Sequence, residues 1–263
     1  MPECGTYLYA VARDSVDAPA SLTGVGETSV RALAHGGLTA YVSTVPLEQF
    51  GEEALRHNLE DLAWLEATAR AHHRVIDALA RTTLTAPVRL VTIYRNDDHV
   101  RAVLKDRFEE FSAVLSSLNG RQEWGVKVYA DPEDTDPPAP AAQGDTGSRL
   151  PGTAYLKRRQ TTLRSRESAR RTAVSRAEEI DAALAAVAVT ARRHRVQDPQ
   201  LSGREESMAL NGAYLVDVDR GKEFTALAGA LGGNGIQIEL TGPWAPYSFT
   251  TLELGGTSTE TRT

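Results

Sequence analysis

The histidines are the residues whose types most readily suggest chemistry, but their spacing argues against a metal site. His72 and His73 are adjacent, so on a helix their side chains point about 100° apart and cannot share an ion as residues four apart can. The remaining four show no zinc-like spacing with other ligands: His35, His57, His99 and His194. We therefore expect histidines that are exposed or partly packed, and we expect neither a metal nor a cofactor.

Glycine-rich and nucleophile motifs give no case for catalysis either. The run Gly232–Gly235 follows a predicted helix and precedes a predicted strand, whereas a phosphate cradle needs a strand, then the loop, then a helix N-terminus. The sequence contains no G-x-S-x-G elbow and no Walker lysine, and its single cysteine, Cys4, cannot form an internal disulfide. The sequence therefore predicts no catalytic residues and a protein that is not an enzyme.

A proline-rich aromatic segment, Leu240–Phe249, stands out near the end of the chain. Its two prolines favour an extended, stiff backbone. It carries three aromatic residues: Trp244, Tyr247 and Phe249. Such side chains offer a large contact area at low entropic cost, which suits docking to a partner chain or packing on the protein's own core. Both interpretations stay open, and we take the three aromatic residues as candidate partner contacts.

Composition and charge exclude several classes of protein. The chain has 41% hydrophobic residues and a net charge of −6, and it contains no apolar run near the length of about 18 residues that a membrane span needs. A net acidic chain argues against a general nucleic-acid binder. The N-terminus lacks a basic region followed by an apolar stretch, and one cysteine suits a reducing compartment. We expect a cytoplasmic protein without a membrane span or a nucleic-acid partner.

The charge is unevenly distributed along the chain. An acidic, proline-rich stretch over residues 131–152 precedes a basic segment with eight cationic residues: Lys157, Arg158, Arg159, Arg164, Arg166, Arg170, Arg171 and Arg176. This segment is a solvated helix face, a docking surface for an acidic partner or for the acidic linker itself, or a nucleic-acid contact. The lack of interleaved aromatic residues weakens the last interpretation. We take Arg158, Arg159 and Arg164 as a candidate electrostatic docking strip.

The elements that would position these residues are mixed helices and strands. In the first half, strands are expected at 6–11, 38–43, 88–94 and 124–129. Apolar residues at steps of three and four predict one amphipathic helix over 52–81, with Leu59 and Leu62 on its apolar face, and another from about Asn96 to Leu118. In the second half we expect a helix over 153–195, about 60 Å long, a strand at 213–217, a helix at 221–231 and a strand at 236–240.

The fold class is therefore α+β, with two small sandwich domains that have mainly antiparallel sheets and helices on one face. The expected boundaries are 1–130 for the first domain, 131–152 for a flexible linker, 153–254 for the second domain and 255–263 for a disordered tail.

An ordered set of segments resembles the gas vesicle protein F/L family. The segments lie at 5–11, 38–46, 72–76, 86–90, 121–129, 155–156, 211–216 and 240–249. They span nearly the whole chain and agree in order and spacing with the family. Ala245 stands where a proline is expected, and the linker and the threonine-rich end are peculiar to this chain.

The resemblance implies two α+β domains, of which at least one is ferredoxin-like, and a non-enzymatic role in assembling gas vesicles. It implies the small, very hydrophobic main shell protein and other gas vesicle proteins as partners, and a location at the gas vesicle or in the cytoplasm. A shell monomer with an exposed apolar face would aggregate before assembly unless a partner covered that face. The resemblance leaves open whether the chain is an F-type or an L-type member, and it leaves the oligomeric state open.

Two other classes of function remain as alternatives. A small-molecule-sensing or regulatory α+β protein would need an apolar pocket with converging polar groups. An enzyme would need strongly perturbed titratable groups that meet in a cleft.

Overall fold

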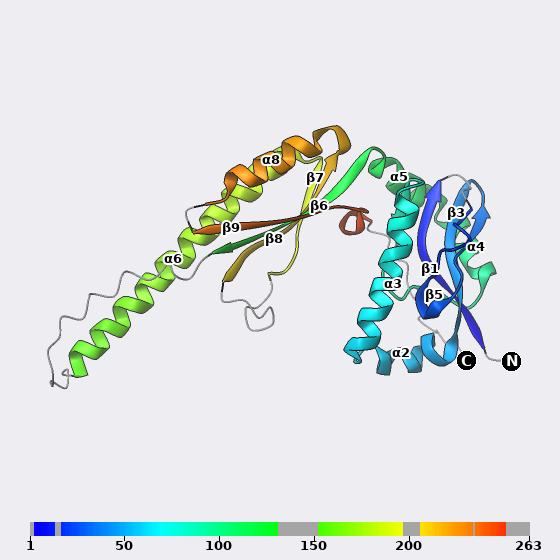
Figure 1. The fold of residues 1–263 in the computed structure, drawn as a ribbon, viewed down its shortest axis with the longest axis horizontal. Coiled ribbons are helices and arrows are strands. Elements are labelled where there is room, and N and C mark those ends of the chain that lie inside the picture. Colours follow the sequence, from blue (N-terminus) through cyan, green and yellow to red (C-terminus); the bar gives the residue numbers. More distant parts are fainter. Residues whose placement is uncertain (1–2, 14–16, 131–151, 197–205, 234, 251–263) are drawn as a thin grey trace. The chain divides into compact units, whose positions relative to one another are not determined.

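The protein divides into two compact units, which we describe in a computed structural model of residues 3–13, 17–130, 152–196, 206–233 and 235–250 (Figure 1). The first unit comprises Met1–Gln122 together with Trp244–Thr263, and the second comprises Glu123–Pro243. Within the long helix of the second unit, the side chains of residues 152–159, 161–166 and 169 are outside this description.

The first unit is built on an antiparallel sheet with the order β2-β3-β1-β4, and β5 also pairs with β1. The strands are β1 (Cys4–Arg13), β2 (Arg31–His35), β3 (Leu38–Pro46), β4 (Thr85–Pro87) and β5 (Ile93–Tyr94). The helices are α1 (Leu47–Phe50), α2 (Glu52–Asn58), α3 (Leu62–Ala80), α4 (Asp97–Asp106) and α5 (Phe108–Leu118).

Helices cover both faces of this sheet, not one face as the sequence predicts (Figure 1). Tyr7 bonds to His72 of α3, and its neighbour Thr6 bonds to Asp97 of α4. Successive residues of a strand point to opposite faces, so α3 and α4 lie on opposite sides of β1. The eight residues between the two ends of β1 are accordingly all buried.

The helix predicted over 52–81 is broken into α2 and α3. The carboxylate of Asp61 accepts hydrogen bonds from the backbone N–H groups of Ala63 and Trp64, which starts a new helix at this point. The break rotates the apolar residues around it away from the core. Leu59 and Leu62 are therefore 45% and 80% exposed, although the periodic pattern predicts them on the buried face.

The second unit has the element order β-α-β-β-α-β of a ferredoxin-like sandwich. Its main elements are β6 (Arg121–Ala130), α6 (Gly152–Val187), β7 (Thr190–Arg193), β8 (Ser207–Asp217), α8 (Gly221–Leu231) and β9 (Ile236–Trp244). The strands lie in the order β7-β8-β6-β9, so the first and third strands are central. The predicted α+β class with two sheets, one of them in a ferredoxin-like unit, is confirmed.

The units differ from the predicted domains at both ends of the second unit. β6 is predicted to close the first domain, but Val126 and Val128 pack into the core of the second unit. Ala245 and Tyr247 are predicted in the second domain, but they pack against the core of the first. These partners are distant in the sequence, so the local pattern does not show them. The predicted linker up to residue 151 and the predicted tail at 255–263 lie outside the described residues.

Among the described side chains of the helix α6, those that are buried lie in its C-terminal part. Its buried residues are Ala177, Ile180, Asp181, Leu184 and Val187. It ends at Val187, earlier than the predicted Arg195, because the chain enters strand β7 at Thr190. At 1.5 Å per residue the helix is about 54 Å long, and its N-terminal part extends past the strands of its own unit (Figure 1).

Candidate functional site

Residues from separate parts of the chain meet around His72 in the first unit. The His72 side chain is buried; its Nδ1 lies 3.0 Å from the Tyr7 hydroxyl, and its Nε2 lies 3.3 Å from the Val88 carbonyl. A carbonyl oxygen can only accept, so Nε2 carries the proton and Nδ1 accepts from Tyr7. The Tyr7 hydroxyl in turn accepts from the Val91 N–H at 3.0 Å. Every polar atom of this pair is therefore used in holding the fold together.

Burial keeps this pair in its neutral form. Removal from water lowers the pKa of His72 to about 4 and raises the pKa of Tyr7. At neutral pH, His72 is uncharged and Tyr7 is protonated. Neither side chain reaches solvent, so neither can exchange a proton with a substrate. His72 is thus a structural histidine, and it is more buried than the exposed or partly packed position that the sequence predicts.

The neighbouring His73 packs against the C-terminal aromatic segment. Its ring stacks on the ring of Tyr247, with the two centroids 5.8 Å apart. It also makes an edge-type contact with the ring of Trp244, with the two centroids 5.5 Å apart. Its Nε2 lies 3.2 Å from the Asp77 carboxylate, so the proton belongs on this nitrogen, and Nδ1 accepts from the Tyr247 hydroxyl at 3.3 Å. We call the group formed by His72, His73, Trp244 and Tyr247 the histidine cluster.

The three candidate aromatic residues differ in their surroundings. Tyr247 is half-buried against the core of the first unit, next to the buried Ala245. Phe249 is also half-buried, in the short 3-10 turn Tyr247–Phe249. Trp244 keeps 41% of its surface exposed although its ring contacts His73. The segment therefore packs on its own unit, and Trp244 offers the largest exposed fraction among the three.

The backbone just before the aromatic residues requires a glycine at position 242. Gly242 has a φ of 122°, which side-chain-bearing residues rarely adopt, and a Cβ there would lie 2.9 Å from the Glu123 carbonyl. Only glycine fits at this point of β9, directly before the aromatic residues.

The sequence analysis missed the role of His72, although a usable signal exists. On a helix of 3.6 residues per turn, His72 falls on the same face as Thr68, Val75 and Leu79, all of which are buried. A histidine on that face is expected inside. The pattern contains no sign of its partners, because Tyr7 lies 65 residues away in the chain.

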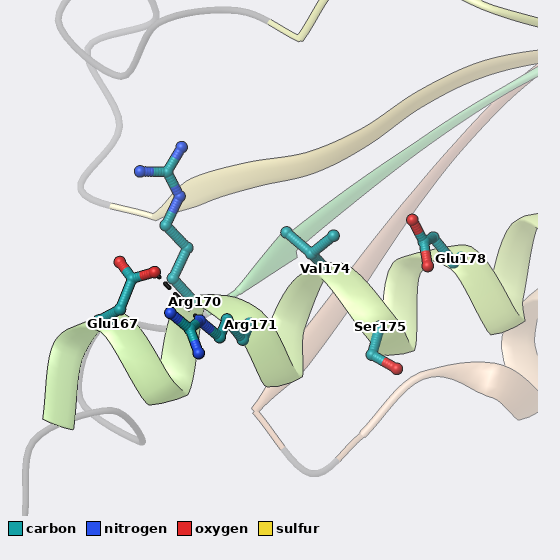
Figure 2. A pocket seen from close by; sticks show the side chains of 6 residues that line it. All are labelled: Glu167, Arg170, Arg171, Val174, Ser175 and Glu178. Atoms are coloured by element: carbon teal, nitrogen blue, oxygen red, sulfur yellow. Dashed lines mark hydrogen bonds and ion pairs between the residues drawn. The ribbon is translucent and has the colours of Figure 1, made fainter. Parts of the chain in front are cut away.

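The candidate arginine strip lies on α6. Arg158, Arg159 and Arg164 are part of this helix, but their side chains lie outside the described residues. Further along, a hollow of about 270 Å³ runs along the same helix (Figure 2). It is lined by Glu167, Arg170, Arg171, Val174, Ser175 and Glu178.

This hollow lacks the character of a small-molecule site. Its lining residues all come from one helix and recur at steps of three and four, so they form an open face without converging groups. Arg171 and Glu167 pair with each other at 3.1 Å. The lining contains two arginines and two glutamates, so its formal charges balance. It is not the enclosed apolar pocket that a ligand-sensing protein would need.

A buried carboxylate in the second unit is also satisfied internally. Asp181 of α6 accepts from the Tyr214 hydroxyl at 2.5 Å and from Arg193 Nε at 2.6 Å. Burial and the bond to Asp181 raise the pKa of Tyr214. The group ties α6 to β7 and β8. Among the residues that the structure describes, no group of three or more His, Cys, Asp or Glu side chains could hold a metal ion.

Comparison with known proteins decides the family. The model of the family described as gas vesicle synthesis protein GvpL/GvpF matches residues 5–251. The chain belongs to this family. Gas vesicle protein L of Streptomyces sp. (strain CB03234) is 42% identical over 250 residues, covering 92% of this chain and 91% of that protein. Gas vesicle protein F of the same strain is 30% identical over 255 residues, covering 93% and 98%.

Solved structures of the family share the fold. The crystal structure of GvpF from Anabaena sp. PCC7120 superposes with a TM-score of 0.64 at 21% identity, covering 95% of this chain and 97% of that one. The GvpF structure from Microcystis aeruginosa gives 0.63 at 16% identity, covering 94% and 99%. The family suggested by the ordered segments is thus confirmed. In the described part of this family member, no helix is long and apolar enough to cross a membrane.

Proposed function

We propose that this chain is a gas vesicle assembly or minor structural protein that binds the hydrophobic main shell protein and supports vesicle formation without catalysis. The match of the GvpL/GvpF family to residues 5–251 is the observation that carries the proposal. It acts in the cytoplasm or at the growing vesicle, together with other gas vesicle proteins. Its similarity to the Streptomyces protein L exceeds that to protein F, which supports an L-type member.

The chemistry of the described residues supports a role without catalysis. The strongly perturbed groups are Tyr7, His72 and Tyr214, and each is buried and bonded to another part of the fold. Burial in a core differs from the solvent-accessible cleft in which catalytic groups work. These residues stabilise the units that present the binding surface.

Trp244 is the proposed principal contact for the shell protein. Trp244 is 41% exposed, its ring contacts His73, and His73 in turn stacks on Tyr247, so binding would order few additional side chains. Tyr247 and Phe249 take part mainly by fixing the segment and by their remaining exposed area. Arg158, Arg159 and Arg164, which belong to α6 of the second unit, form the proposed electrostatic strip.

The proposal is tested by the solubility of the shell protein. We expect that the shell protein expressed alone sediments on centrifugation, and that co-expression with this chain leaves a measurable part of it in the supernatant. An unrelated soluble protein of similar size serves as the control. Complete sedimentation under every assembly condition, with this chain soluble and folded, would remove the basis of the proposal.

Replacing Trp244 by alanine is expected to weaken shell-protein binding by at least about 2 kcal/mol, or roughly thirtyfold. The fold should change little, because the side chain is 41% exposed. Phe108→Ala is a matched control, since Phe108 is 38% exposed and begins α5 instead. Binding isotherms of both variants provide the comparison. Unchanged binding of a folded Trp244→Ala variant would show that this side chain is purely structural.

A further inference from the structure

The N-terminal part of α6 has no packed face in the described structure. We define Gly152–Thr172 as the α6 arm; at 1.5 Å per residue it is about 32 Å long. Each of its described side chains is exposed: Gln160, Glu167, Ser168, Arg170, Arg171 and Thr172. Among the described side chains of α6, Ala173 is the first that packs against the core of the second unit. A polar helix that extends from its unit in this way needs a reason beyond the stability of that unit.

The arm is strongly basic in an acidic protein. It holds seven cationic residues and one acid, Glu167, so its net charge is +6, whereas the whole chain carries −6. Among the described side chains, Glu167 pairs with Arg171, and no ion pair of Arg170 is seen. The arm also begins a helix, whose N-terminal dipole adds partial positive charge. The arm therefore concentrates a positive potential at one end of the second unit.

We propose that the α6 arm docks an acidic segment of another protein. Charge complementarity selects this occupant, since a surface of net +6 attracts clustered carboxylates, and arginine binds carboxylates through two parallel hydrogen bonds. A contact between the arms of two copies is disfavoured because two such arms would repel each other. The described side chains of the arm before Ala173 are polar and suit an acidic partner better than the hydrophobic shell protein, so the inference does not rest on shell binding.

Nucleic acid fits the arm less well than an acidic protein segment. The arm contains a single aromatic residue, Tyr155, whereas single-stranded nucleic acids are usually held by several aromatic side chains that stack on bases. The remainder of the chain is net negative and would repel a long polyphosphate. A short acidic segment is confined to the arm and avoids this repulsion.

The hollow at the base of the arm adds a second feature to the site. Arg170, Val174 and Glu178 lie on one side of the helix, one turn apart from each other (Figure 2). Val174 is 44% exposed and gives the hollow an apolar floor beyond the last arginines of the arm. An acidic segment that ends in an apolar side chain would place its carboxylates on the arm and that side chain over Val174.

The test is a titration of the full chain with a fluorescent 20-residue polyglutamate peptide, followed by anisotropy at increasing salt. We expect binding at low salt that weakens as salt rises. The variant R158Q/R159Q/R164Q should bind roughly tenfold more weakly, because three positive charges that can pair with the peptide carboxylates are removed. Glutamine keeps a high helix propensity, and circular dichroism checks that the arm stays helical.

A matched control removes three exposed arginines from the first unit: R56Q/R70Q/R101Q. This control should bind within about twofold of the original chain, since its charges lie outside the arm. Equal loss in both variants, no loss in the arm variant, or binding that ignores salt would each overturn the proposal.

Two further measurements distinguish an acidic protein segment from the other possible occupants of the α6 arm. Single-stranded RNA of equal charge is expected to bind more weakly than polyglutamate, and tighter binding of RNA would overturn the assignment to a protein partner. The variant D131N/E133Q/D134N/D136N removes four acidic residues of the stretch that precedes the arm in the chain. Its affinity for polyglutamate should match that of the original chain. Binding that appears only in this variant would show that the chain occupies its own arm.

Discussion

Removing residues 244–263 is expected to lower the free energy of unfolding of the first unit by about 4 kcal/mol. The deletion takes away Ala245 and Pro246, which are buried, and the half-buried Tyr247 that stacks on His73. The loss of this apolar burial, together with the space left on α3, accounts for the estimate. Hydrogen exchange of β1 and α3 in the full-length and shortened chains measures the effect for the first unit alone.

Removing only residues 251–263 is the control for this truncation. This shorter deletion keeps Ala245 and Tyr247, which pack against the core of the first unit, so the exchange rates of β1 and α3 should stay unchanged if these residues carry the stabilisation. If both truncations had equal effects, or if neither had any, the aromatic segment would not be part of the first unit's core.

Lowering the pH from 7.5 towards 4 is expected to destabilise the first unit by about 3 kcal/mol through His72 alone. Its pKa is about 4 in the folded protein and 6.5 in the unfolded chain. Between these values the unfolded chain binds the proton more readily, so the contribution of His72 is fully present above pH 6.5 and is lost as the pH falls towards 4. The size follows from 1.36 kcal/mol for each unit of difference.

His72→Gln isolates this effect from the other titrating groups. Glutamine is uncharged and can still donate to Val88 and accept from Tyr7, so the variant should be less stable at pH 7.5 but should lose less stability on acidification. Urea unfolding of both proteins at pH 7.5 and 4.5 gives the two differences. Parallel losses in the two proteins would mean that His72 is not neutral in the folded state.

Much of the fold could be predicted from local patterns. The alternation in Ile236–Leu240 predicts β9, and the apolar spacing of the helices predicts α3 and the packed part of α6. Breaks inside a periodic pattern were harder to predict. The helix expected from Asn96 to Leu118 divides into α4 and α5 at Arg107, whose φ of −113° is outside the helical range. The pattern of apolar residues is the same on both sides of such a break.

The region at 88–94 shows how tertiary contacts override strand propensity. It is rich in branched residues, yet only Ile93 and Tyr94 form a strand. The Val88 N–H bonds to the Tyr9 carbonyl, and the Val91 N–H bonds to the Tyr7 hydroxyl. Val91 accordingly has a φ of 64°, which a branched residue adopts only when its surroundings enforce it. Nothing in the segment itself indicates these partners.

The candidate site could be predicted only in part, because its contacts join residues that are distant in the sequence. Proline and aromatic residues single out the C-terminal segment, either for docking to a partner or for packing on the protein's own core, and Trp244 is 41% exposed in the structure. That Tyr247 meets His73 follows from a contact between residues 174 positions apart, which no local pattern contains. The choice between docking and core packing therefore needed the structure, in which Tyr247 packs inward and Trp244 remains exposed.

The most direct test of the central claim is co-purification of this chain with the main gas vesicle shell protein after expression in the same cell. An affinity tag on this chain should retain the shell protein as a soluble complex, and Trp244→Ala should reduce the amount retained while Phe108→Ala should not. If the folded, tagged chain retained no shell protein, the proposed assembly role through direct binding would be contradicted.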